Sequence, residues 1–117
     1  MDSLEAIRQA ARQFVDDRSW DEYQSPKNLS MAMIVEAGEL VEHFQWMEST
    51  ASRNPDAATV REIAAELADV LVYLVRIADE LDIDLAAETL SKIRRNADKY
   101  PLSTSVKGPL RIKPEDI

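Results

Sequence analysis

Two pairs of acidic residues have a spacing that could support chemistry. The two members of each pair are three positions apart, within a segment whose pattern is typical of a helix. Glu36 and Glu39 form the first pair, and Glu66 and Asp69 form the second. This spacing puts both carboxylates of a pair on one face of a helix. If the two faces meet, four like charges need a cation between them or bound protons. The sequence therefore predicts a magnesium site made by these four residues, which are also the candidate catalytic residues.

The composition narrows the kind of metal site. The chain has no cysteine and a single histidine, His43, so a thiolate site is excluded and the Glu-x-x-His motifs of a di-iron bundle are missing. Oxygen ligands favour a hard cation such as Mg²⁺ over zinc. The plain alternative is a solvated helix face, where paired acids are common. Against it, Glu36 falls on an apolar stripe, where an acid without a partner is costly.

The overall composition is that of a globular protein of one domain. The chain has 117 residues, of which 45% are hydrophobic and 31% are charged, and its 2 glycines and 5 prolines disfavour an all-β fold. A net charge of −8 argues against a nucleic-acid polymer as partner, because phosphate binding needs a basic face. No signal peptide or membrane-spanning run is visible, so we expect a cytoplasmic protein with no membrane partner.

Hydrophobic periodicity predicts an all-α fold, a bundle of four to five helices. The predicted helices cover about residues 3–18, 26–48, a third segment opened by Asn54-Pro55 and running to Leu81, and 85–99. Between them, residues 19–26 and 49–55 are predicted to be loops. Pro101 ends the last helix, so we expect one domain over 1–101 and an extended tail over 102–117.

Two of these helices carry further information. Gly38 lies inside the second helix and costs it roughly 1 kcal/mol relative to Ala, so we expect another group to approach the backbone there. The third helix has an apolar face wider than a single seam, which favours packing on both sides, including against another subunit.

The predicted fourth helix carries a polar face that suits phosphate. Lys92, Asn96 and Lys99 follow helical spacing, with Arg95 nearby. Beside a metal site, lysine supplies a point charge and asparagine a directed donor for phosphate oxygens. An ordinary solvated face is the alternative.

Three aromatic residues are candidates for stacking on a base. They are Trp20, Trp46 and Tyr73. Aromatic residues at helical spacing are more often part of the core, and Trp20, in a predicted loop, fits the core least.

These motifs occur in an order that resembles a known family. The segments are Glu36-Ala-Gly-Glu39-Leu, Phe44-Gln-Trp46, Glu66-Leu-Ala-Asp69-Val-Leu-Val-Tyr73 and Lys92-Ile-Arg-Arg-Asn96-Ala-Asp-Lys99-Tyr-Pro101. Together they resemble the MazG-like all-α nucleoside triphosphate pyrophosphohydrolases, and within these the dCTP pyrophosphatase branch. The resemblance runs from about Trp20 to Pro101.

The resemblance implies a helical bundle that works as a homo-oligomer, a tetramer built as a dimer of dimers or a dimer. It implies Mg²⁺-dependent cleavage of a nucleoside triphosphate between the α- and β-phosphates, which gives monophosphate and pyrophosphate. The four acids match the magnesium ligands, and one of them, Glu39, would help to take the proton of the attacking water. The positions that match substrate contacts, with the neighbouring basic residues, are Trp20, Asn28, Trp46, Tyr73, Lys92, Arg95, Asn96 and Lys99.

One position departs from that pattern. Relatives that prefer dCTP carry a histidine where this chain has Ala11, so the substrate could be dCTP or a modified dNTP, while metal-dependent hydrolysis is unaffected. The competing hypothesis is a non-catalytic helical module for oligomerisation or nucleotide binding, in which the acids only keep an apolar surface soluble.

Overall fold

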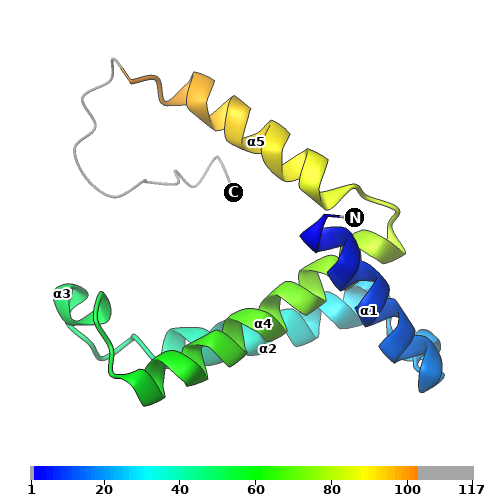
Figure 1. Ribbon diagram of the computed structural model, residues 1–117, viewed down its shortest axis with the longest axis horizontal. Coiled ribbons are helices and arrows are strands. Elements are labelled where there is room, and N and C mark those ends of the chain that lie inside the picture. The colour runs from blue at the N-terminus through cyan, green and yellow to red at the C-terminus, as the bar shows by residue number, and fades with distance from the viewer. Residues whose placement is uncertain (1, 103–117) are drawn as a thin grey trace. The chain divides into compact units, whose positions relative to one another are not determined.

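The computed structural model describes residues 2–102, and within that range the regular structure is all helical. The helices are α1 (Ser3–Asp17), the 3-10 helix η1 (Asp21–Tyr23), α2 (Pro26–Glu42), α3 (Ser49–Ser52), α4 (Ala57–Glu80) and α5 (Leu85–Lys99) (Figure 1). The predicted all-α class is confirmed. The predicted tail, apart from Leu102, lies outside the described residues.

The helices begin where local hydrogen bonds satisfy their first N–H groups. Asp2 caps α1 by accepting a bond of 2.8 Å from the Glu5 N–H. Ser25 caps α2 by accepting a bond of 3.1 Å from the Asn28 N–H, with Pro26 at the first helical position. Both predicted starts are thus confirmed.

Four predictions about helix ends and loops were wrong. The second helix ends at Glu42 instead of about residue 48, because the next N–H groups turn back to nearer carbonyls, as in the bond of 3.2 Å from His43 to Leu40. The predicted loop at 49–55 contains α3, and the loop at 19–26 contains η1. The third helix starts at Ala57, because Asp56 caps it through the Thr59 N–H.

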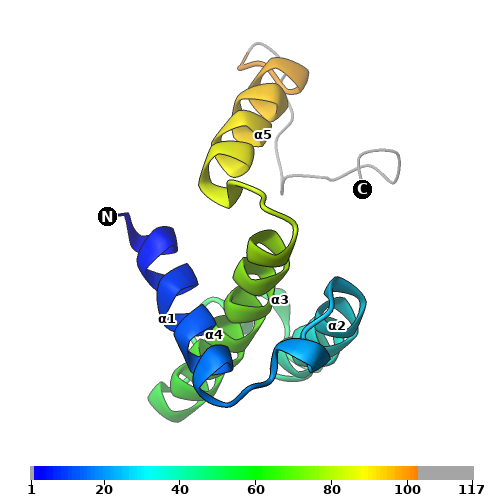
Figure 2. The same ribbon diagram turned by 90° about the vertical axis from the view of Figure 1, so that its right-hand side faces the viewer.

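The chain divides into two units, one up to Ala86 and one from Ala87 onward. In the first unit α4 packs against both α2 and α1. Figure 1 shows α2 and α4 side by side and running in opposite directions, and Figure 2 shows the same helices with α1 beside α4. The buried apolar side chains come from these three helices: Val15, Leu29, Val75 and Ala78.

The antiparallel pair of α2 and α4 is the part of the fold that positions the acids, since it sets two long helical faces against each other. The expected close approach to Gly38 is not seen, because apart from its chain neighbours and the adjoining backbone of α2 no described atom lies within 4 Å of where its Cβ would be.

The second unit holds the rest of α5, and the single domain predicted over 1–101 stays a prediction. Within residues 2–102, no helix combines the length and hydropathy that crossing a bilayer requires.

Candidate active site

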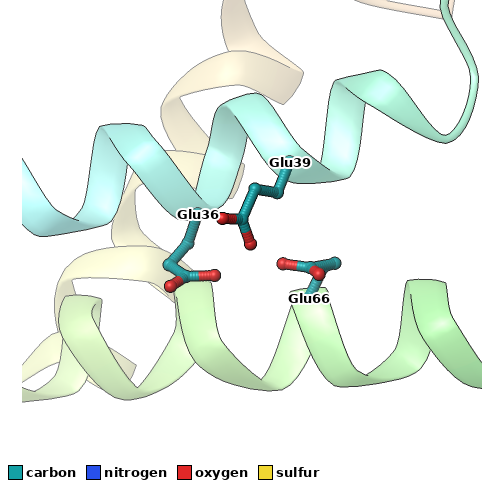
Figure 3. A group of neighbouring side chains, drawn as sticks. All are labelled: Glu36, Glu39 and Glu66. Atoms are coloured by element: carbon teal, nitrogen blue, oxygen red, sulfur yellow. The ribbon is translucent and has the colours of Figure 1, made fainter.

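Three of the four predicted acids meet between α2 and α4. Figure 3 shows Glu36 and Glu39 reaching down from α2 and Glu66 reaching up from α4. Each offers a carboxylate oxygen, and these oxygens all lie within 4.8 Å of one another. We call these three residues the acidic cluster. Their convergence follows from the sequence spacing, because one turn separates the α2 pair and the facing helix supplies the third carboxylate.

Two oxygens of the acidic cluster are buried without a partner. Oε2 of Glu36 and Oε2 of Glu66 form no hydrogen bond within residues 2–102. A buried acceptor left unpaired costs roughly 1–3 kcal/mol, and more when it is charged. These two oxygens and the oxygen-only ligand set fit a hard divalent cation such as Mg²⁺.

The electrostatics agree with that geometry. Partial burial, followed by the neighbouring carboxyls of Glu39 and Glu66, raises the pKa of Glu36 from 4.5 to about 7. Partial burial and Glu39 also raise the pKa of Glu66. A group held between like charges keeps its proton or needs a cation to replace it. The acidic cluster is therefore a strained arrangement unless a positive charge joins it.

Asp69, the fourth predicted acid, lies one turn after Glu66 on α4 but outside the closest group. Its charge still acts on the acidic cluster, since it helps to raise the pKa of both Glu36 and Glu66. Asp69 and Glu36 both line a pocket in the first unit. The acids thus stand at the border between the cluster and that pocket.

The pocket has a volume of about 220 Å³ and a mixed aromatic and polar lining. It is smaller than the roughly 300–1,000 Å³ of sites that take a whole drug-sized ligand, so it suits one ring system of a larger ligand. We call it the aromatic pocket. Its lining residues are Ala11, Phe14, Val15, Trp20, Gln24, Glu36, Asp69, Val72, Tyr73 and Arg76.

Two of the predicted aromatic residues, Trp20 and Tyr73, line this pocket. The Trp20 ring meets Phe14 edge to face, with ring centroids 5.6 Å apart and planes at 74°, an arrangement that aromatic pairs prefer. The turn before it is held by a bond of 3.1 Å from the Trp20 N–H to the Val15 carbonyl. The structure therefore fixes Trp20 although it lies outside any helix.

Two other predicted substrate contacts lie elsewhere in the first unit. Trp46 is 90% exposed and does not line the aromatic pocket. Asn28 donates from Nδ2 to the Tyr23 carbonyl at 3.2 Å, which ties the loop after η1 to the start of α2. In this structure Asn28 shapes the loop that carries the pocket residues.

The predicted phosphate contacts all lie on α5. Lys92 and Arg95 line a shallow, open depression of about 360 Å³ together with Glu88, Thr89 and Ile93. Asn96 is half-buried on the same helix, and Lys99 lies in its last turn. They belong to the second unit and are described with it.

Sequence reasoning missed a set of ion pairs between α1 and α4. Arg76 is a polar residue with 3% exposure, which is rare for arginine without partners. Its signal was visible, because Asp79 and Glu80 follow at the three- and four-residue spacings at which helical side chains meet. Arg8 and Arg12 also bond to Asp79 across the helix pair, at 3.1 and 2.6 Å. We call these five residues the ion-pair network.

His43 also lies closer to the acids than expected. Its Nε2 is 4.0 Å from Glu66 Oε1, and its Nδ1 is 3.8 Å from Glu62 Oε2. The spacing of four residues between Glu39 and His43 was the available signal, since it puts His43 on the same face of α2.

The comparisons with known proteins agree with one another. Residues 31–107 match the model of the MazG-like family. The chain is 41% identical over 106 residues to dCTP pyrophosphatase 1 of Rattus norvegicus, covering 88% of this chain and 62% of the relative. It is 40% identical over 102 residues to dCTP pyrophosphatase 1 of Homo sapiens, covering 85% and 59%. The chain thus spans about three fifths of the length of these curated relatives.

A solved structure matches over nearly its whole length. The crystal structure of a pyrophosphatase from Archaeoglobus fulgidus superposes with a TM-score of 0.74 at 32% identity. The match covers 86% of this chain and 94% of that chain.

Proposed function

The chain belongs to the MazG-like family, and on that premise we propose that it is a Mg²⁺-dependent nucleoside triphosphate pyrophosphohydrolase. Its products would be a nucleoside monophosphate and pyrophosphate. The observation that carries the proposal is the acidic cluster, in which three carboxylates share a space with two buried, unpaired oxygens. The relatives named above as pyrophosphatases support the same reaction class.

The acids of the first unit have separate roles in this proposal. Glu36, Glu39, Glu66 and Asp69 would hold the Mg²⁺ ions, which neutralise the triphosphate and lower the pKa of a bound water. Glu36 and Glu66 each have one buried oxygen without a hydrogen-bond partner. Glu39 has no buried, unpaired oxygen, so it remains the choice for taking the proton of the water that attacks the α-phosphorus.

The aromatic pocket would receive the base beside those acids. Trp20 and Tyr73 line the pocket with aromatic rings, and Glu36, a member of the acidic cluster, lines it together with Asp69. That adjacency lets one nucleotide reach both. Ala11 also lines the pocket, where the resemblance puts a histidine in dCTP-preferring relatives, so the base accepted could be cytosine or a modified base.

The basic residues of α5 would neutralise the leaving pyrophosphate. Lys92 and Asn96 match substrate contacts of the family, and Arg95 and Lys99 lie within one turn of them. Charge-assisted bonds from such groups favour the transition state when they are aimed at the oxygens where charge develops. Asn28 and Trp46 are kept as substrate contacts in this proposal, on the strength of the resemblance.

We also propose a homo-oligomer, either a dimer or a tetramer built as a dimer of dimers, located in the cytoplasm. α2 and α4 expose large apolar side chains in the first unit, which a second copy would cover. The most exposed of them are Met31 at 57%, Ile34 at 64%, Val35 at 59%, Val41 at 57% and Leu67 at 53% exposure. Light scattering after size exclusion measures the state, and a monomer at micromolar concentration would contradict it.

The function is tested with a panel of canonical and modified (d)NTPs in Mg²⁺, in which chromatography reads both monophosphate and pyrophosphate. Hydrolysis in ¹⁸O-labelled water should put the label into the monophosphate, because the attack is on the α-phosphorus. Release of orthophosphate, or no turnover of any nucleotide, would contradict the proposal. Nucleotide binding without turnover would favour the non-catalytic module.

A further inference from the structure

One contact in the wall of the aromatic pocket has no role in the function proposed above. Gln24 follows η1 in the loop between α1 and α2, and its side chain reaches Arg76 on α4. Nε of Arg76 lies 3.3 Å from Oε1 of Gln24. Both residues line the pocket, with Trp20 and Tyr73. The contact is therefore part of the lining of the pocket in which the base would bind.

Arg76 is held in place by two other bonds. Its Nη1 donates to Asp79 Oδ2 at 2.9 Å, and its Nη2 donates to Glu80 Oε1 at 2.6 Å. With 3% exposure, the guanidinium has little room to turn. Two carboxylates thus fix its planar fork, and in that orientation its Nε–H donates to Gln24.

This geometry decides which way the Gln24 amide faces. A guanidinium only donates hydrogen bonds, so the atom beside Arg76 Nε must be the carbonyl oxygen of the amide. The other end, Nε2, has two N–H groups and makes no hydrogen bond within residues 2–102. Gln24 is half-buried, and its own backbone N–H is tied to the Asp21 carbonyl at 3.1 Å. Gln24 therefore brings two N–H donors to the lining of the pocket, with the amide orientation set by Arg76.

We propose that Gln24 is a specificity-determining residue, which donates from Nε2 to an acceptor on the base edge, a ring nitrogen or a carbonyl oxygen. Arg76 is its positioning residue, because it holds the amide in the donating orientation. This role of Gln24 rests on the proposed function, and it identifies the base edge as the part of the nucleotide that the pocket recognises. The Gln24 carbonyl already accepts from Arg76, whereas both N–H groups of Nε2 are left to donate, so the site favours an acceptor over an amino group.

The test compares nucleotides with a triphosphate that has no base. Gln24→Leu should lower kcat/KM for the best dNTP about three- to tenfold, mainly through KM, since one neutral hydrogen bond is lost. The inhibition constant of abasic deoxyribose 5′-triphosphate should stay within about twofold, because that molecule has no base edge to bond. The matched control is Gln13→Leu, on an exposed face of α1, where the amide bonds only Asp17.

A second variant inverts the chemistry at the same position. Gln24→Glu keeps an acceptor for Arg76 but turns the pocket-facing donor into an acceptor, so the same dNTP should lose more than in Gln24→Leu. Bases that present an amino group should lose least. If the dNTPs lose nothing, or if abasic triphosphate loses as much as they do, the inference is wrong. If the wild type hydrolyses no nucleotide at all, it is the proposed function that fails.

Arg76→Lys tests the positioning role. Lysine keeps a positive charge near Asp79 but lacks the Nε–H of the guanidinium fork. It should raise KM for dNTPs while kcat and the inhibition constant of the abasic triphosphate change little. Thermal melts check that each variant is folded, and the two Gln24 variants decide the matter if the buried Arg76 tolerates no change.

Discussion

The acidic cluster and the ion-pair network both include residues of α4, yet their charges are balanced in opposite ways. The acidic cluster brings Glu36, Glu39 and Glu66 together without any basic side chain within hydrogen-bond distance, over the residues described. About four turns further along α4, Asp79 receives bonds from several arginines of the ion-pair network. Both groups are partly buried, yet only the second is balanced by its own partners.

The pKa values show the consequence. Burial and like charge raise the pKa of Glu36 to about 7. At Asp79 burial also acts to raise the pKa, but the bonds from Arg12 and Arg8 outweigh it and hold the pKa below its usual value of 3.8. Buried acids without basic partners are tolerated where a bound ligand neutralises their charge. The difference supports the proposed metal binding at the acidic cluster and predicts a role in stability for the ion-pair network.

The largest effect is expected from Glu66→Gln. It removes a charged ligand but keeps the shape of the side chain, so pyrophosphate release should fall about 10³-fold, the scale for losing a group aimed at the reacting charge. The melting temperature without metal should not fall, because like-charge repulsion is relieved. Steady-state assays and melts measure both.

The matched control for that variant is Glu62→Gln, one turn earlier on α4 and 68% exposed. It should keep activity within about twofold, since a surface substitution outside the cluster has little effect. Full activity in Glu66→Gln would contradict the difference in role between the acidic cluster and the ion-pair network, because the cluster would then not be needed for catalysis.

Asp79→Asn should show the reverse pattern. It leaves the buried Arg76 without one of its charged partners, and breaking a buried ion pair costs about 3 kcal/mol or more. For a domain of this size that lowers the melting temperature by about 10 °C or more, with metal affinity little changed. Urea unfolding and a metal titration measure the two quantities. A loss of metal binding without a loss of stability would contradict the division of roles.

The two groups should also respond to pH with opposite sign. Because the folded pKa of Glu36 is raised from 4.5 to about 7, its contribution to the stability of the metal-free protein is present below about pH 4.5 and is lost as pH rises through about 7. The lowered pKa of Asp79 gives a contribution that is present above about pH 3.8 and is lost as pH falls through its folded pKa.

Melts in a chelator should therefore show a melting temperature that declines from about pH 5 to about pH 8. Glu36→Gln should flatten that decline, since the substituted amide does not titrate. Excess Mg²⁺ should cancel it, because metal binding displaces the proton. If the melting temperature of Glu36→Gln declined with pH as steeply as that of the wild type, titration of Glu36 would not be the cause of the decline.

The smallest effect is expected at the edge of the ion-pair network. Arg12 bonds Asp79 but its side chain is 54% exposed, and exposed ion pairs contribute little. Arg12→Gln should lower the melting temperature by about 2 °C or less, and activity should not change. A shift as large as that of Asp79→Asn would mean that the exposed arginine, not the buried one, holds the network together.

Much of this fold could be predicted because helix caps are local. Asp2 and Ser25 bond the N–H groups three residues later, and such spacing is visible in the sequence. Asn54-Pro55 predicts a helix start because asparagine can cap a helix and proline suits its first turn. Asp56, two residues after Asn54, is also a capping residue type, and it is the one that caps α4. The end of α2 was missed because apolar residues in the turns after it continue the helical spacing.

The candidate site could be predicted where its residues lie on one face of a single helix. Glu36 with Glu39, and Glu66 with Asp69, were found by spacing. Which of the four meet most closely depends on how α2 and α4 are set against each other, and the sequence does not contain that register.

The Gln24–Arg76 contact lay beyond sequence reasoning for the same reason, since 52 residues separate its partners. In the ion-pair network, local spacing predicts only the pairs within α4, those of Arg76 with Asp79 and Glu80.

The central claim is that the acidic cluster binds a divalent cation, and titration with Mn²⁺ followed by electron paramagnetic resonance measures this most directly. The wild type should deplete the signal of free Mn²⁺, and Mg²⁺ should restore it by competition. Glu66→Gln should leave most of the Mn²⁺ unbound, while Glu62→Gln behaves like the wild type. Equal Mn²⁺ binding by the wild type and Glu66→Gln would contradict the account.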